Sequence, residues 1–271
     1  SNATTWTAKK TDLEGQSLEE KNTPTLSEKL NFVAFDTETT GLDHNNDELI
    51  EIAAVRFRAG EVSERWSTLV KPRKGMPKFI QYLTHIDPQD LKDAPQVDSA
   101  LKQFFDFIGD DILVAHNAGF DTGFINHYSA LCGGDLIQRP VWDTVEIART
   151  WFPFTPDHRL GTMTDHFGIV LENAHRAGAD AEATGLLLVK MSEHILAHYS
   201  MLTNARLLDL SRQAQLENSL YSYLRVIVEQ QRRTALMGKK PQPPETARPN
   251  VMENNVPKSS FDISEVFTED G

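Results

Sequence analysis

The chain has 271 residues, a net charge of -12 and a pI near 5.2. This acidic balance argues against a protein that coats duplex nucleic acid through bulk electrostatics, but it still allows an enzyme that acts on a nucleic-acid end. A single cysteine, Cys132, excludes an internal disulfide and fits a reducing cytoplasm. Since the sequence shows no secretory signal and no apolar run long enough to span a membrane, we expect a cytoplasmic protein.

Residues 1–28 are polar and show no regular period, which predicts a flexible arm, and its first three residues are typical of a tag remnant. We expect residues 29–198 to form one domain. The apolar run at 32–35 is typical of a strand buried on both faces, and two further strands complete an antiparallel meander. The strands after the first are expected at 49–57, 62–70, 112–115 and 141–142, and the helices at 101–108, 120–128, 143 onward, 160–167 and 179–196. The sum is an α/β fold, a mixed sheet flanked by helices.

Two segments follow this domain. Apolar residues at helical spacing within 199–237 predict a C-terminal helical extension, formed by one helix or a helix pair. Residues 238–271 hold five prolines among polar residues, which predicts a disordered tail. Two interpretations of residues 261–267 stay open, an unstructured end and a docking segment for a polymerase, a sliding clamp or a helicase.

Acidic residues mark the ends of two predicted strands. Asp36 and Glu38 are two apart at the end of the first strand, so both side chains point to the same face and can reach one ion. Apolar neighbours place these charges beside a core, where an unpaired carboxylate is costly. Asp121 lies at the start of a helix that follows a strand, a position that also suits a helix cap.

His175 and Asp180 form the third acidic motif. On one continuous helix, residues five apart would point well over a right angle away from each other. We therefore expect Gly178 to let His175 lie on a loop while Asp180 projects from the following helix. A histidine on a loop can approach a water molecule as a general base without occupying a metal position. Four carboxylates that share a pocket need cations to offset their repulsion.

Three motifs in this order resemble the DEDDh superfamily of 3'-5' exonucleases, the DnaQ-like group that includes the proofreading epsilon subunit of bacterial replicative DNA polymerase. They are Asp36-Thr37-Glu38-Thr39-Thr40-Gly41-Leu42, His116-Asn117-Ala118-Gly119-Phe120-Asp121, and His175 with four residues before Asp180. The resemblance covers about residues 31–191. One departure is Thr84-His85-Ile86, where the family often has Thr-Gly-Ile near the terminal nucleotide.

The resemblance implies an RNase H-like fold and a two-metal nuclease. Mg2+ or Mn2+ would be held by Asp36, Glu38, Asp121 and Asp180, and His175 would take a proton from the attacking water. The 3' nucleotide would contact Thr37, Thr39, Thr40, Gly41, Leu42, His116, Asn117 and Phe120. The implied reaction removes nucleoside 5'-monophosphates from the 3' end of DNA, preferably single-stranded, in proofreading or repair.

Two alternatives to a DNA exonuclease stay open. The first is a different nuclease, either an RNA-trimming relative or an exonuclease module that works beside a DinG-type helicase. The second is a non-catalytic exonuclease fold that serves as a binding or assembly module. The physiological substrate, the pathway, the oligomeric state and the effect of His85 on specificity do not follow from the sequence.

Overall fold

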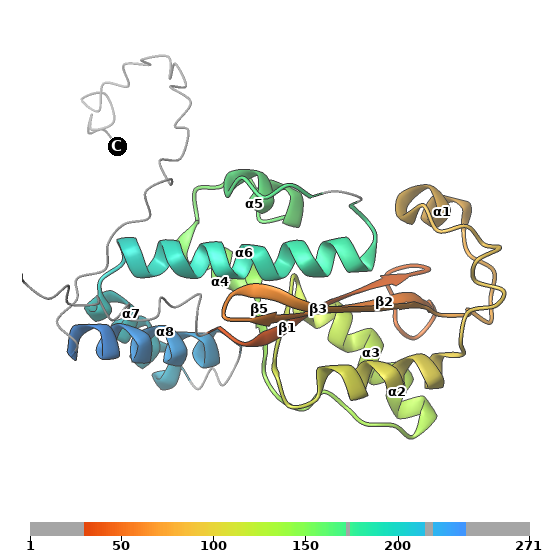
Figure 1. Ribbon diagram of the computed structural model, residues 1–271, viewed down its shortest axis with the longest axis horizontal. Helices are drawn as coiled ribbons and strands as arrows, with labels where there is room; N and C mark the ends of the chain where they lie inside the picture. The colour runs from red at the N-terminus through yellow and green to blue at the C-terminus, as the bar shows by residue number, and fades with distance from the viewer. Residues whose placement is uncertain (1–29, 172–173, 215–218, 237–271) are drawn as a thin grey trace, which may run out of the picture.

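The computed structural model describes residues 30–171, 174–214 and 219–236 (Figure 1). The arm expected at 1–28, the tail expected at 238–271 and the docking segment considered at 261–267 lie outside the described residues. No helix in the described ranges is long and apolar enough to cross a membrane.

A five-stranded sheet of order β3-β2-β1-β4-β5 forms the centre of the fold. β1, β2 and β3 pair antiparallel, whereas β4 pairs parallel with β1 and β5 pairs parallel with β4. The predicted meander and the mixed sheet are therefore confirmed. The strands are β1 (Phe32–Thr39), β2 (Leu49–Arg58), β3 (Glu61–Leu69), β4 (Ile112–Ala115) and β5 (Val141–Asp143).

Helices cover both faces of the sheet (Figure 1). Because β1 side chains alternate, Phe32 and Ala34 join the core under α6, whereas Val33 and Phe35 join the core formed with α2 and α3. Both faces of β1 are therefore apolar near its start, as the continuous run at 32–35 predicts. The helices are α1 (Lys78–Thr84), α2 (Val97–Ile108), α3 (Ala118–Cys132), α4 (Thr144–Trp151), α5 (Leu160–His166), α6 (Ala177–His198), α7 (Met201–Gln213) and α8 (Ser219–Leu236).

The C-terminal extension is a helix pair, α7 and α8, that packs against the sheet domain. Tyr223 is fully buried beside Trp142 and Trp151, and its hydroxyl lies 2.8 Å from the hydroxyl of Ser192 on α6. Trp142 Nε1 donates to Ser222 Oγ at 3.0 Å. The pair thus shares the core under α6 and holds the C-terminal end of that helix.

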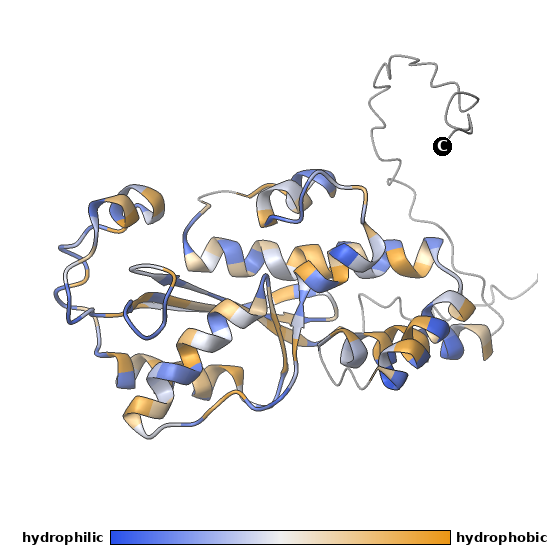
Figure 2. Ribbon diagram, turned by 180° about the vertical axis from the view of Figure 1, so that it is seen from behind, coloured by the Kyte–Doolittle hydropathy of each residue, from blue (hydrophilic) through white to orange (hydrophobic). Residues whose placement is uncertain are grey.

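One helix, α1, was not expected. Pro72 and Gly75 end the strand pattern, and the seven residues of α1 start immediately after Pro77, without a side-chain cap. Only Ile80 and Thr84 of this helix are buried, so its periodicity is too short to detect. Figure 2 shows α1 as a short helix of mixed hydropathy beyond one end of the sheet.

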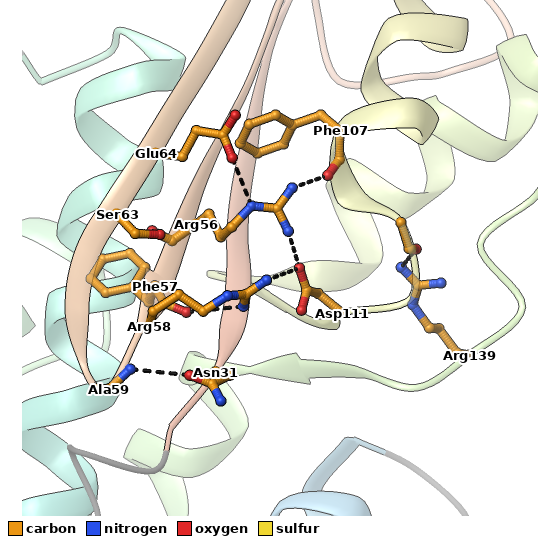
Figure 3. A network of polar contacts seen from close by, with 11 residues as sticks. Asn31, Arg56, Phe57, Arg58, Ala59, Ser63, Glu64, Phe107, Asp111 and Arg139 are labelled. Carbon is orange, nitrogen blue, oxygen red and sulfur yellow. Dashed lines mark hydrogen bonds and ion pairs between the residues drawn. The ribbon is translucent and has the colours of Figure 1, made fainter.

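An arginine network ties β2 to the loop before β4 (Figure 3). Asp111 accepts hydrogen bonds from Arg56 and, at 2.8 Å, from Arg58 Nη2. Arg56 also pairs with Glu64 at 2.9 Å and lies over the Phe107 ring, 4.7 Å from its centroid. These contacts fix the end of α2 against the sheet, so the parallel strand β4 enters in register with β1.

Candidate active site

β1 and α6 bring three carboxylates together. Asp36 and Glu38 continue the face of β1 that packs under α6, and Asp180 lies in the first turn of that helix. One oxygen from each of these residues lies within 4.8 Å of the other two. The expected convergence of Asp36 and Asp180, which are 144 positions apart, is therefore present in the fold.

Asp121 approaches β1 from the other side of the sheet. It lies in the first turn of α3, is 2% exposed, and its Oδ1 accepts from Thr37 N at 3.0 Å and from Thr37 Oγ1 at 2.7 Å. Thr37 lies between Asp36 and Glu38 but points to the opposite face of the strand. Asp121 is consequently outside the three-residue group and locks the strand that carries two of its members.

Burial and mutual repulsion make this site unfavourable for four charges. Burial first, and then the charges of Asp121, Glu38 and Asp180, raise the pKa of Asp36 well above its usual value. Burial and the nearby Asp180 raise the pKa of Glu38 to about 8. Burial raises the pKa of Asp121 to about 7, although the bonds from Thr37 oppose this, and burial also raises the pKa of Asp180. A divalent cation would offset all four effects.

The donor set fits a hard cation. Asp180 Oδ1 is buried and has no hydrogen-bond partner in the described part of the chain, whereas its Oδ2 accepts from His175 N at 3.1 Å. A buried carboxylate oxygen without a partner is costly unless it binds an ion or water. Carboxylate oxygens are the ligands that Mg2+ and Mn2+ prefer.

His175 lies on the turn before α6, as expected, but the cause of the turn differs from the prediction. We expected Gly178 to break the helix, yet α6 starts at Ala177 and includes Gly178. The backbone of His175 itself adopts the left-handed conformation, with φ 65, and Arg176 is the helix cap. The His175 side chain is exposed beside Asp180, where a general base can reach solvent.

Glu51 and Arg176, which we did not single out in the sequence, hold that turn. The Glu51 carboxylate is buried and accepts from Arg176 Nε at 3.1 Å, Arg176 Nη2 at 2.9 Å and Ala177 N at 3.1 Å. A bidentate pair of this kind fixes orientation as well as charge. Glu51 therefore sets the start of α6, and with it the placement of His175 and Asp180.

The turn after β1 contains most of the expected substrate contacts. Thr37, Thr39 and Thr40 are buried. The Thr37 hydroxyl donates to Asp121, the Thr39 hydroxyl donates to the Gly41 carbonyl, and the Thr40 hydroxyl accepts from the backbone N–H of Glu48. A Cβ added at Gly41 would lie 2.4 Å from the Asp47 carboxylate, so a larger residue here would displace the Asp47 side chain. Leu42 is 85% exposed at the tip, where it is free to contact a ligand.

The second cluster of expected contacts follows β4. Burial lowers the pKa of His116 to about 4, so the ring is neutral at pH 7, and its Nδ1 lies 2.8 Å from Thr144 Oγ1. The backbone of Asn117 adopts the left-handed conformation, and its backbone N–H donates to Asp143 Oδ1 at 3.0 Å. Phe120 is half-buried on α3. Asp143, which caps α4 at the helix start expected from 143 onward, therefore orients this loop.

The family model described as Exonuclease matches residues 33–188, more than half of the chain. The chain belongs to the exonuclease family. The predicted resemblance to DnaQ-like DEDDh exonucleases is confirmed, and the matched segment includes every residue of the carboxylate site. Exonucleases of this family use divalent metals, in agreement with the acidic cluster.

Curated relatives of this exonuclease are much longer proteins. PolC-type DNA polymerase III of Bacillus cereus is 45% identical over 165 residues, and that of Bacillus subtilis is 43% identical over 167 residues. Each alignment covers 61% of this chain and 12% of the relative. The chain thus spans a small part of the length of these polymerases.

Solved exonucleases share the fold. Exonuclease X in complex with 5' overhanging duplex DNA aligns with a TM-score of 0.51 at 22% identity over 60% of this chain and 92% of that chain. Exonuclease I aligns with a TM-score of 0.56 at 20% identity over 67% and 44%. The nuclease domain of 3'hExo, a DEDDh family member, aligns with a TM-score of 0.53 at 15% identity over 60% and 91%. The RNase H-like architecture expected from the motifs is confirmed.

We expect the metal-free exonuclease to lose stability as the pH rises. Because the pKa of Glu38 is about 8 in the folded chain and 4.5 ordinarily, the folded state keeps a proton that the unfolded chain has lost. The resulting stability is complete below the ordinary pKa and disappears as the pH approaches 8. Thermal unfolding in chelator from pH 5 to 8.5 measures this fall.

Two additions test the origin of that fall. Cation at about 100 times its Kd should restore roughly 2.7 kcal/mol at pH 8, because it binds the ionised site. Glu38→Gln should raise the Tm in chelator at pH 8 and lose the cation effect. A metal-free Tm that is flat or rising over this pH range would contradict the electrostatic description of the site.

Glu51→Gln tests the anchor of α6. A neutral amide cannot keep the paired contacts with Arg176 and Ala177, so His175 and Asp180 should lose alignment and kcat should fall by about 10- to 100-fold. The KM for an oligonucleotide should change little. The matched control is Glu64→Gln, which removes the exposed partner of Arg56 on β3. Normal kcat from a merely less stable Glu51→Gln protein would assign Glu51 a structural role only.

Proposed function

We propose that this chain is a metal-dependent 3'-5' exodeoxyribonuclease that releases nucleoside 5'-monophosphates from DNA ends in proofreading or repair. The observation that carries the proposal is the group formed by Asp36, Glu38 and Asp180, with a buried and unpartnered Asp180 oxygen beside the exposed His175. Kinship with PolC-type DNA polymerase III supports DNA as the substrate.

Each residue of the site has a proposed role. Asp36, Glu38 and Asp180 would hold one divalent ion, Asp36 would bridge to a second, and Asp121 would act at the edge of the site. Bound Mg2+ or Mn2+ would supply charge neutralisation at the attacking and leaving oxygens. His175 takes the proton of the attacking water, because its loop places it next to Asp180 and open to solvent.

The terminal nucleotide would lie between the turn after β1 and the loop after β4. Since the threonine hydroxyls of that turn are internally bonded, the backbone of Gly41 and the side chain of Leu42 would make the contacts on one side. His116, Asn117 and Phe120 would line the other side. Apolar and stacking contacts tolerate any base, which suits digestion of any sequence.

A single digestion experiment tests this function. Single-stranded DNA, mismatched duplex and RNA of the same sequence, each labelled at the 5' end, are incubated with Mg2+ or Mn2+ and then with chelator. The expected result is a ladder that shortens from the 3' end, nucleoside 5'-monophosphate as product, and no reaction in chelator. Faster RNA digestion would indicate an RNA-trimming enzyme, and no digestion with either ion would indicate a non-catalytic module.

A further inference from the structure

A basic segment lies beside the carboxylate site of this acidic chain. Residues 65–86 contain five Lys and Arg and no Asp or Glu, although the whole chain has 39 acidic and 27 basic residues. Four of the five basic residues lie in the loop and helix start at 71–78. Such a local reversal of charge creates an electrostatic contrast next to the site.

Glu48 attaches this loop to the rim of the site. Its buried carboxylate accepts from Arg73 N at 3.1 Å and Lys74 N at 2.7 Å. The Glu48 carbonyl accepts from Thr40 N at 2.8 Å, and Glu48 N donates to Thr40 Oγ1 at 2.9 Å. Because Thr40 is two residues past Glu38, the basic loop is held against the turn that borders the carboxylates.

Two aromatic side chains project from the helix that follows. Phe79 and Tyr82 are one turn apart on α1 and are 70% and 78% exposed, and Lys78 beside them is also exposed. The opposite side of α1 holds Ile80 and Thr84, which are buried. The aromatic rings therefore contribute little to the core. A ligand can contact and bury their exposed surface.

The cations on this face are also available. Among the described residues, no carboxylate forms an ion pair with Lys71, Lys74 or Lys78, whereas Arg73 pairs with Glu48 at 3.3 Å. Lys71 Nζ and Lys74 Nζ donate to the backbone carbonyls of Lys92 and Asn46, at 2.6 Å and 2.9 Å, which are neutral acceptors and leave the lysine charges uncompensated. Lysines followed by two exposed aromatic rings match a single-stranded polynucleotide, whose phosphates attract the cations and whose bases stack on the rings.

We infer that the loop at 71–78 and the outer face of α1 bind the single-stranded stretch of nucleic acid that leads to the reacting end. This inference rests on the proposed nuclease function. Lys74 and Lys78 contact phosphates, and Phe79 and Tyr82 stack on bases. The positive charge of the face suits an anionic ligand, and the two exposed aromatic rings beside it favour a polynucleotide over a second copy of the acidic chain, because they can stack on bases.

The test is binding of fluorescent oligothymidylates of 4 and 16 nucleotides to the full chain in chelator, followed by fluorescence anisotropy. The paired variants are Lys74→Ala with Lys78→Ala, and Phe79→Ala with Tyr82→Ala. The matched controls are Lys102→Ala, an exposed lysine of α2, and Phe154→Ala, an aromatic residue that is 99% exposed. Thermal unfolding checks that every variant is folded.

We expect each paired variant to weaken binding of the 16-mer by at least about tenfold, with a smaller effect on the 4-mer, while the controls bind as the wild type does. The lysine pair should also reduce the slope of log K against log salt by about 1.4, since two phosphate contacts are lost. Paired variants that bind the 16-mer like the wild type would overturn the inference and leave this face to a protein partner.

Hydrolysis of a dinucleotide by the wild-type chain with Mn2+ separates this inference from the proposed function. Turnover of the dinucleotide, together with 16-mer binding that the variants leave unchanged, would contradict the strand-binding inference and support the proposed nuclease activity. Absence of turnover, together with weaker 16-mer binding by the variants, would contradict the proposed nuclease activity and support the strand-binding inference.

Discussion

Asp36→Ala should abolish metal-dependent hydrolysis, with a loss of about 10³-fold or more. Asp36 belongs to the carboxylate group and is the residue proposed to bridge both ions, so its removal eliminates the charge stabilisation that metal ions supply, worth several kcal/mol. Initial rates on a labelled single strand with saturating Mn2+ measure the loss.

The Asp36→Ala protein should remain folded. Its carboxyl group is destabilising in the metal-free chain, because burial and four neighbouring carboxylates oppose its charge. The Tm in chelator should therefore match or exceed that of the wild type. Asp106→Ala, on the exposed side of α2, is the matched control and should keep full activity. Appreciable metal-dependent digestion by Asp36→Ala would place the site elsewhere.

Local patterns predict the part of the site that lies on one strand. The apolar run at 32–35 identifies β1, and the two-residue period then puts Asp36 and Glu38 on one face without any knowledge of the rest of the fold. The position of Asp121 at a helix start also follows from local pattern. Its contact with Thr37 does not, because it depends on which face of β1 packs against α3.

Contacts between distant residues account for what the sequence did not predict. The Glu51 and Arg176 side chains are separated by 125 positions, and Glu51 is the single acidic residue of the strand at 49–58, where no local motif marks it. Only the pairing of β2 beside β1, and the placement of α6 above both, reveal its role. Likewise, the left-handed backbone conformation of His175 depends on how the turn packs. Because glycine favours such conformations, we expected the break before the helix at Gly178 and not at His175.

His175→Ala should retain cation binding and lose most of the rate. A general base typically contributes ~10²–10⁴-fold, so a fall within this range is expected at saturating metal and substrate. Cation binding should survive because the three grouped carboxylates do not include His175. Metal-induced stabilisation, followed as the increase in Tm, separates the two effects.

The backbone of residue 175 requires a second variant, since alanine is strained at φ 65 whereas asparagine tolerates the left-handed region. His175→Asn keeps the turn and removes the base, so it should be as slow as His175→Ala, and added imidazole should restore part of the rate in both variants. If His175→Asn turned over normally, the histidine would serve only to form the turn that presents Asp180. Loss of activity without rescue, combined with loss of metal-induced stabilisation, would likewise point to a role in placing the carboxylate and not in moving the proton.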